Sequence, residues 1–192
     1  MKKIMFNDKF GLTKAVLEGR KTMTRRIIPA DVAKKLIIPG EPGFFPDVPC
    51  MGLYEHSRFK VGEVVAVAQA YKDTCWTSPV LMLKDKPGWG NKMFVYAGLM
   101  PHQLRITNVR VERLQDISDE DCLREGIYNW KDAPDCPPGH KDSKIECYGY
   151  DGSWDGHLTP ITAFAALIDK VSGKGTWASN PWVFVYEFEL VK

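Results

Sequence analysis

The sequence is organised around residues 17–26, which read Leu17-Glu18-Gly19-Arg20-Lys21-Thr22-Met23-Thr24-Arg25-Arg26. Just before this stretch, apolar residues recur at i, i+3 and i+4 (Leu12, Ala15, Val16), and this spacing predicts a short helix. Gly19 tolerates a positive φ, so we expect the helix to end there. From Thr22 the pattern has a period of two, which predicts a strand with Met23 and Ile27 on one face and Thr22, Thr24 and Arg26 on the other.

The predicted helix-to-strand corner concentrates polar groups. It carries four cations (Arg20, Lys21, Arg25 and Arg26) and the hydroxyls of Thr22 and Thr24. Such a corner attracts an anion or a polar heterocycle. The alternative is a solvated basic edge strand, in which Lys and Arg serve to discourage aggregation.

Three segments resemble one known family. The spacing Gly19-x-Lys21-x-x-Thr24-x-Arg26 resembles the G-x-K-x-x-[E/T]-x-R signature of the ASCH domain family, small β-barrels related to the PUA RNA-binding fold. The turn at residues 61–63, before a predicted buried strand at 64–68, is also similar to these barrels. The segment Leu114–Ile127 resembles the matching segment of bacterial and phage ASCH proteins, and we expect a short helix there, between an N-cap at Ser118 and Gly126.

The resemblance implies an α+β protein, with a PUA-like ASCH β-barrel and short flanking helices in a single domain that covers residues 1–192. Three long insertions, at about 29–60, 73–92 and 128–157, have no counterpart in the small family members. We predict that residues 29–60 are mostly loop. Further strands are predicted at 3–6, 93–97, 104–114 and 182–190, the last with its aromatic residues on one side only. A helix is predicted from Pro160, with Thr159 as its N-cap, to about Val171.

Composition limits the class of function. Lys and Arg number 26 against 24 Asp and Glu, a net charge of +2, so bulk charge will not hold long nucleic acid and any contact needs a local patch. The N-terminus has no apolar core of a signal peptide, and no apolar run is long enough to span a membrane. Five cysteines at irregular spacing favour reduced thiols and a cytoplasmic location.

One branch of the ASCH family removes the acetyl group from N4-acetylcytidine, and its motif G-R-K-T-x-T-x-R matches residues 19–26. The resemblance implies Thr24 as nucleophile, Lys21 as general base and Glu125 as proton donor. A threonine hydroxyl needs an adjacent base, and a lysine serves as one only if its pKa falls, which burial beside Arg25 or Arg26 would cause. Glu125 would have to hold a proton for the leaving amine. In an ideal strand Lys21 and Thr24 face opposite sides, unless Lys21 precedes the strand.

Three functions are consistent with these residues. The first is recognition of RNA or a modified nucleoside in a basic cleft formed by Gly19, Arg20, Lys21, Arg25 and Arg26, and it is our main hypothesis. The second is the amidohydrolase, and the third is a phage or mobile-element accessory protein whose insertions bind another protein. A purely structural alternative is a Lys21–Glu125 ion pair with Thr24 bonded to backbone.

A metal site is a weaker hypothesis. Cys136, His140 and Cys147, with Cys50 or Cys122, could supply zinc ligands, but they lack the paired Cys-x₂-Cys spacing of structural zinc sites. We therefore predict no metal and no cofactor.

Overall fold

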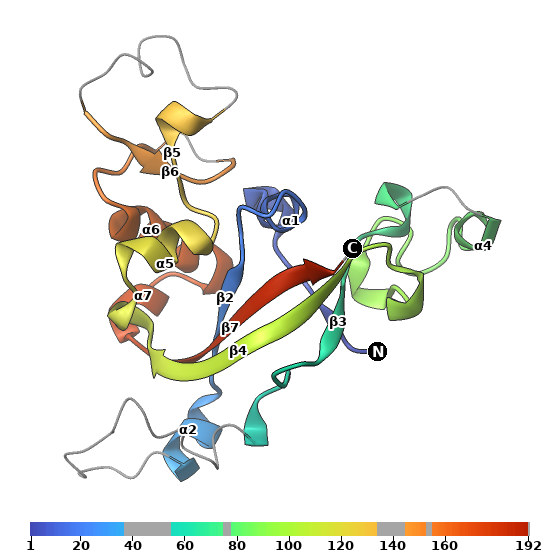
Figure 1. Cartoon of the computed structure of the whole chain (residues 1–192), viewed down its shortest axis with the longest axis horizontal. Coiled ribbons are helices and arrows are strands. Elements are labelled where there is room, and N and C mark those ends of the chain that lie inside the picture. The colour runs from blue at the N-terminus through green and yellow to red at the C-terminus, as the bar shows by residue number, and fades with distance from the viewer. Residues whose placement is uncertain (37–54, 75–77, 134–144, 153–154, 192) are drawn as a thin grey trace.

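The computed structural model describes residues 1–36, 55–74, 78–133, 145–152 and 155–191, and these residues form an α+β structure (Figure 1). A five-stranded sheet has the order β1-β3-β4-β7-β2. Its strands are β1 (Lys3–Ile4), β3 (Val64–Val67), β4 (Gln103–Arg113), β7 (Trp182–Val191) and β2 (Met23–Ile27). The β1–β3 pair is parallel and the other pairs are antiparallel. The strand predictions at 3–6, 64–68, 104–114 and 182–190 are confirmed, although β1 is shorter than expected.

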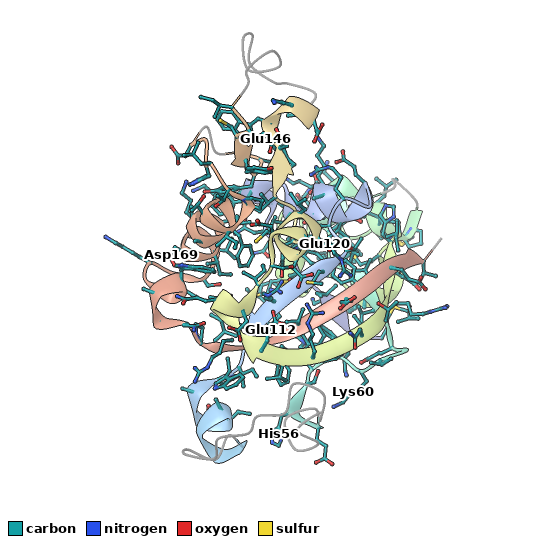
Figure 2. All side chains as sticks on the ribbon, turned by 60° about the vertical axis from the view of Figure 1, so that its left-hand side comes forward. His56, Lys60, Glu112, Glu120, Glu146 and Asp169 are labelled. Atoms are coloured by element: carbon teal, nitrogen blue, oxygen red, sulfur yellow. The ribbon has the colours of Figure 1, made fainter. Side chains whose placement is uncertain are left out.

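Both faces of β7 are buried. Phe6 and Phe59 pack on Phe188 and Tyr186, with ring centroids 5.8 and 5.2 Å apart, as expected for a core face. The opposite face, which includes Val183 and Val185, is buried as well. In the sheet β7 lies between β4 and β2, and residues from both of its faces belong to the main hydrophobic cluster. Side chains fill the space between the sheet and the helices (Figure 2).

The helix predictions are confirmed, with their caps. Helix α1 (Leu12–Leu17) is followed by Gly19 at φ 74°, and α5 (Asp119–Arg124) begins at Ser118, whose side chain accepts from the Asp121 N–H. Gly126, at φ 102°, follows α5. Helix α6 (Pro160–Ser172) starts at a capping box between Thr159 and Thr162. A last short helix, α7 (Thr176–Ser179), leads into β7.

Two predictions of local structure were wrong. Residues 29–60 were expected to be loop, but helix α2 (Ala30–Leu36) occupies their beginning, with Asp31 in the first turn where the helix dipole favours it. The strand expected at 93–97 is replaced by two 3₁₀ turns, η3 (Lys92–Phe94) and η4 (Ala97–Leu99). The Asn91 side chain accepts from the Met93 N–H, and this local bond competes with a strand. Residues 37–54 lie outside the described structure.

The other two insertions contain short elements within the described residues. Residues near 73–92 contain η2 (Tyr71–Asp73) and α4 (Ser78–Leu81), and they enclose a small second core. That core consists of Ala66, Ala68, Tyr71, Val80, Val95 and Met100. In 128–157, β5 (Tyr128–Asn129) pairs with β6 (Tyr148–Gly149), and η6 (Trp130–Asp132) follows β5. Two 3₁₀ turns, η1 (Asp8–Phe10) and η5 (Leu114–Asp116), complete the elements of the described chain.

Strands β1 and β2 form the two edges of the sheet, and among the described residues they do not pair with each other. The Arg26 guanidinium, from β2, donates to the carbonyl of Met5, which directly follows β1, at 2.5 Å. The two edges therefore approach one another through a side chain. No described helix has both the length and the apolar character needed to cross a membrane.

Candidate functional site

The corner between α1 and β2 determines where Lys21 points. The Gly19 N–H donates to the carbonyl of Val16, and the Lys21 N–H donates to that of Ala15, both at 3.0 Å. Lys21 thus belongs to the end of the helix and precedes β2, which starts at Met23. The alternation of side chains in β2 therefore does not apply to Lys21, and Lys21 and Thr24 both line one pocket.

This pocket has a volume of about 200 Å³ and lies between β2 and the C-terminal half of α6. Its polar lining comes mainly from the corner, β2 and the end of α5 (Lys21, Thr24, Arg25, Arg26 and Glu125), with Asn7 and Ser172 in addition. Its apolar lining comes mainly from the segment around η1 and from α6: Phe6, Leu12, Phe164, Leu167, Ile168 and Val171. A polar floor and an apolar wall therefore face each other.

Lys21 and Glu125 form a buried ion pair in this floor. Their exposed fractions are 2% and 4%, and the Lys21 Nζ lies 2.5 Å from Glu125 Oε2. The same ammonium donates to the backbone carbonyl of Glu125 at 2.6 Å. That carbonyl belongs to the end of α5, where carbonyls lack helical partners and the helix dipole favours a cation. The contact therefore stabilises the end of α5, as the structural alternative of a Lys21–Glu125 ion pair predicts.

The environment of Lys21 disfavours its charged form. Burial lowers the pKa of the ammonium, and this effect exceeds the attraction of Glu125, which raises it. Arg26 and Arg25 lower the pKa further because they place positive charge nearby. Lys21 is consequently easier to deprotonate than an exposed lysine.

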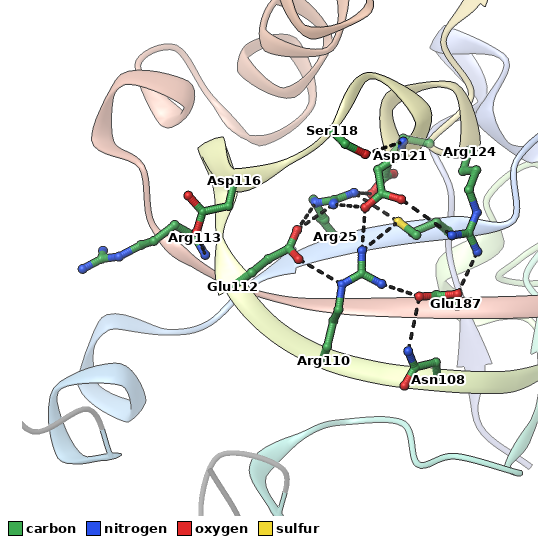
Figure 3. Close-up of polar contacts among 12 residues, drawn as sticks. Arg25, Asn108, Arg110, Glu112, Arg113, Asp116, Ser118, Asp121, Arg124 and Glu187 are labelled. Atoms are coloured by element: carbon green, nitrogen blue, oxygen red, sulfur yellow. Dashed lines mark hydrogen bonds and ion pairs between the residues drawn. The ribbon is translucent and has the colours of Figure 1, made fainter. Parts of the chain in front are cut away.

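Arg25 lies in a network of charges that is shown in Figure 3. Its guanidinium donates to Glu112 (2.6 and 3.0 Å), to Asp121 (2.8 Å), to Glu125 (3.2 Å) and to the sulfur of Met23 (3.2 Å). An arginine has five N–H groups, and these five contacts use all of them. With its side chain only 1% exposed, Arg25 borders the pocket as the neighbour of Glu125 and has no donor left for a ligand.

Arg26, by contrast, has donors to spare in the described structure. Apart from its bond to the Met5 carbonyl, its guanidinium lies over the ring of Phe6, 5.7 Å from the centroid, and it lines the pocket. Lys21 lies over the same ring at 5.9 Å. Phe6 thus packs beneath both cations, a contact that the sequence did not reveal because Phe6 follows a short strand far from the motif.

Two of the residues predicted to bind a ligand, Arg20 and Gly19, lie away from the pocket. Arg20 is exposed, donates to the Glu18 carboxylate at 2.8 and 2.9 Å, and packs over the ring of Tyr128. Gly19 is exposed too, and its role is the left-handed turn. The structure therefore brings together Lys21, Thr24, Arg25, Arg26 and Glu125, and it leaves Gly19 and Arg20 outside.

Thr24 is 5% exposed, and it lines the pocket. Within the described residues its hydroxyl makes no hydrogen bond, so the backbone bond of the structural alternative is not formed. Phe164, Leu167 and Ile168 of α6 line the same pocket, and no pattern in the sequence indicates that this helix reaches the Lys21 corner.

Within the described ranges, no group of three or more His, Cys, Asp or Glu residues is suited to hold a metal ion. Cys147 is half-buried and reduced, whereas Cys50, Cys136 and His140 lie outside the described structure.

Comparisons of the chain with protein-family models, with curated proteins and with solved structures gave no match.

Proposed function

We propose that the pocket at the Lys21 corner binds a nucleobase, as part of a nucleoside or of a short RNA. The observation that carries this proposal is the pairing of a polar floor with an apolar wall in a single small pocket. A nucleobase has two apolar faces and an edge of hydrogen-bond donors and acceptors, so its binding needs both kinds of surface.

The groups in the floor complement the edge of a base. Glu125 offers a hydrogen-bond acceptor, Arg26 offers donors, and the Thr24 hydroxyl can act as either. The volume of about 200 Å³ is below the 300–1,000 Å³ of pockets for drug-sized ligands, which favours one base over a stacked strand. The net charge of +2 supports the same preference for a nucleoside or a short strand.

Amidohydrolysis of an N4-acylated cytidine is the second candidate, and two observations favour it. The Thr24 hydroxyl is not bonded in the described structure, and burial lowers the pKa of Lys21. In such a reaction Thr24 Oγ1 attacks the acyl carbon, Lys21 takes the hydroxyl proton, and Glu125 gives a proton to the departing amine. The acyl ester on Thr24 is then hydrolysed by water, which releases the acid and restores the hydroxyl.

Hydrolysis starts from a neutral Lys21 and a protonated Glu125, and the contact between these two residues provides a route to both. A proton that passes from Lys21 Nζ to Glu125 Oε2, over 2.5 Å, creates the base and the acid together. Arg25 opposes this transfer because its charge stabilises the Glu125 carboxylate. Binding therefore needs only the ion pair, whereas hydrolysis needs the neutral pair.

The proposal includes the ASCH interpretation of the fold. The bond between Arg26 and Met5, which links the two edges of the sheet, supports a sheet that curls towards a PUA-like barrel. A cytoplasmic location is also part of the proposal, in keeping with the reduced state of Cys122 and Cys147.

The test of recognition is calorimetric titration with cytidine and with N4-acetylcytidine. Arg26→Gln should weaken binding about 10-fold or more, since a hydrogen bond to a charged group contributes about 1.5–3 kcal/mol. Arg20→Gln is the matched control, because it removes an arginine of the same motif outside the pocket, and its affinity should equal that of wild type. If wild type binds neither nucleoside nor short cytidine-containing RNA, the proposal fails.

The test of hydrolysis is chromatography of N4-acetylcytidine after incubation with the protein. Thr24→Val, which removes the hydroxyl and keeps the shape, should abolish cytidine release while binding persists. Release by Thr24→Val at the wild-type rate would contradict its role as nucleophile. Binding without release by wild type would leave recognition alone.

A further inference from the structure

We propose that Arg25 is a positioning residue, which fixes the Glu125 carboxylate in the pocket and is itself held by Glu112 and Asp121 outside it. This inference rests on the proposed function only in treating the pocket as the ligand site. It gives Arg25 a role different from that of its neighbour Arg26, although both belong to the same basic run.

The Glu125 carboxylate is held at both of its oxygens. Oε2 accepts from Lys21 Nζ at 2.5 Å, and Oε1 accepts from Arg25 Nη1 at 3.2 Å. A carboxylate held by one partner can rotate about its terminal bond, whereas two partners from different positions determine its plane. The orientation in which Glu125 meets a ligand is thus determined jointly by Lys21 and Arg25.

Arg25 is in turn fixed from the side away from Lys21. Glu112 on β4 accepts from Nε and Nη2, and Asp121 on α5 accepts from Nη2. Arg110 then binds both of these carboxylates, at 2.9 and 2.5 Å (Figure 3). Only an arginine presents donors in a fork that reaches three carboxylates and a sulfur at once, so lysine cannot replace it.

Through this arrangement, the charges of the network influence the protonation of groups in the pocket. The charged and titratable groups around Lys21 and Glu125 are Arg25, Arg26, Asp121 and Cys122, with Glu112 behind Arg25. The positive charge of Arg25 lowers the pKa of Lys21. Glu112 offsets part of the charge of Arg25. A change at Glu112 should therefore alter the protonation of Lys21, which it does not contact in the described structure.

The experiment follows the side chain of Lys21 by NMR, in protein labelled at the lysine Cε and Nζ, as the pH is raised. The Lys21 signal is assigned by its absence from Lys21→Met. Removal of the positive charge in Arg25→Met should raise the titration midpoint of Lys21 by about one pH unit, and removal of the negative charge in Glu112→Gln should lower it. Arg20→Gln, outside the network, should leave it unchanged.

Opposite shifts in Arg25→Met and Glu112→Gln support the inference, and equal midpoints in all variants overturn it. If Arg25→Met does not fold, Glu112→Gln decides alone: a lower midpoint supports the inference and an unchanged one overturns it. Because the titration uses no ligand, its outcome is independent of nucleoside binding. Failure of the proposed function and failure of this inference are therefore distinguishable.

Discussion

Arg25 and Arg26 are adjacent in the sequence, yet their surroundings differ in almost every respect. Arg25 meets three carboxylates and a sulfur with all five of its N–H groups, whereas Arg26 is bonded to one carbonyl and faces the pocket. The reason is the alternation of β2, which directs the two side chains to opposite faces of the sheet. One face holds a closed charge network, and the other holds cations next to a cavity.

This difference shows that a positive charge in a motif need not be available for a ligand. What counts is how many donors remain after the internal partners are satisfied. By this criterion Arg26 is the principal cation for a ligand. Arg25 contributes to rigidity, and Arg20 is occupied by Glu18 at the surface.

The largest effect that we expect comes from removing Arg25. Arg25→Met leaves Glu112, Asp121 and Glu125 without their shared partner, and breaking a buried ion pair from one side costs about 3–5 kcal/mol. We expect the free energy of unfolding, measured by urea denaturation, to fall by about that amount.

Arg26→Met is the matched control for this measurement, since it removes the neighbouring arginine and its one hydrogen bond. Its cost should be about 1 kcal/mol. Equal losses in the two variants would show that the two faces of β2 do not differ as the contacts indicate.

Much of this arrangement could be predicted from residues close together in the chain. The end of α1 at Gly19 and the N-caps at Ser118 and Thr159 depend on local bonds, and all three were predicted correctly. The meeting of Lys21 with Glu125 came from the resemblance to a family. Glu125 by itself indicated only a carboxylate at the unfavourable end of a helix.

The rest of the fold and of the site depends on contacts between distant segments, which local sequence patterns do not indicate. Nothing near Arg25 indicates Glu112, which reaches it from β4, 87 residues away. The burial of both faces of β7 and the α6 wall of the pocket also depend on how distant segments pack together. Local competition explains the missed turn at η3, where a side-chain bond of Asn91 replaces a strand.

A smaller loss of stability is expected from a substitution at the corner between α1 and β2. Gly19 has φ 74°, and a Cβ added there would meet no atom within 4 Å, so Gly19→Ala is strained by its backbone alone. We expect a loss of about 1–2 kcal/mol in urea denaturation. Gly98→Ala, also in open space but not at a positive φ, is the control and should cost less. An equal loss of stability at both positions would contradict a special role of the corner in directing Lys21.

The smallest effect concerns pH, and it distinguishes the lysine of the pocket from the arginines of the network. Burial lowers the pKa of Lys21 below its ordinary value of 10.5, so at alkaline pH the folded protein releases a proton that the unfolded chain retains. Where the unfolded state binds more protons, the free energy of unfolding increases with pH. The stability of wild type relative to Lys21→Met should therefore rise as the pH approaches 10.5, as urea denaturation between pH 7.5 and about 10 would measure.

The other groups that titrate in this range are common to both proteins, and Cys122, whose pKa burial raises to about 12, stays protonated there. Arg25→Met keeps Lys21 but removes a positive charge that lowers its pKa, so the stability of this variant should rise less steeply with pH than that of wild type. A constant difference between wild type and Lys21→Met would mean that the ammonium is fully compensated by Glu125. The pocket would then hold a permanent ion pair, which suits binding and excludes Lys21 as a base.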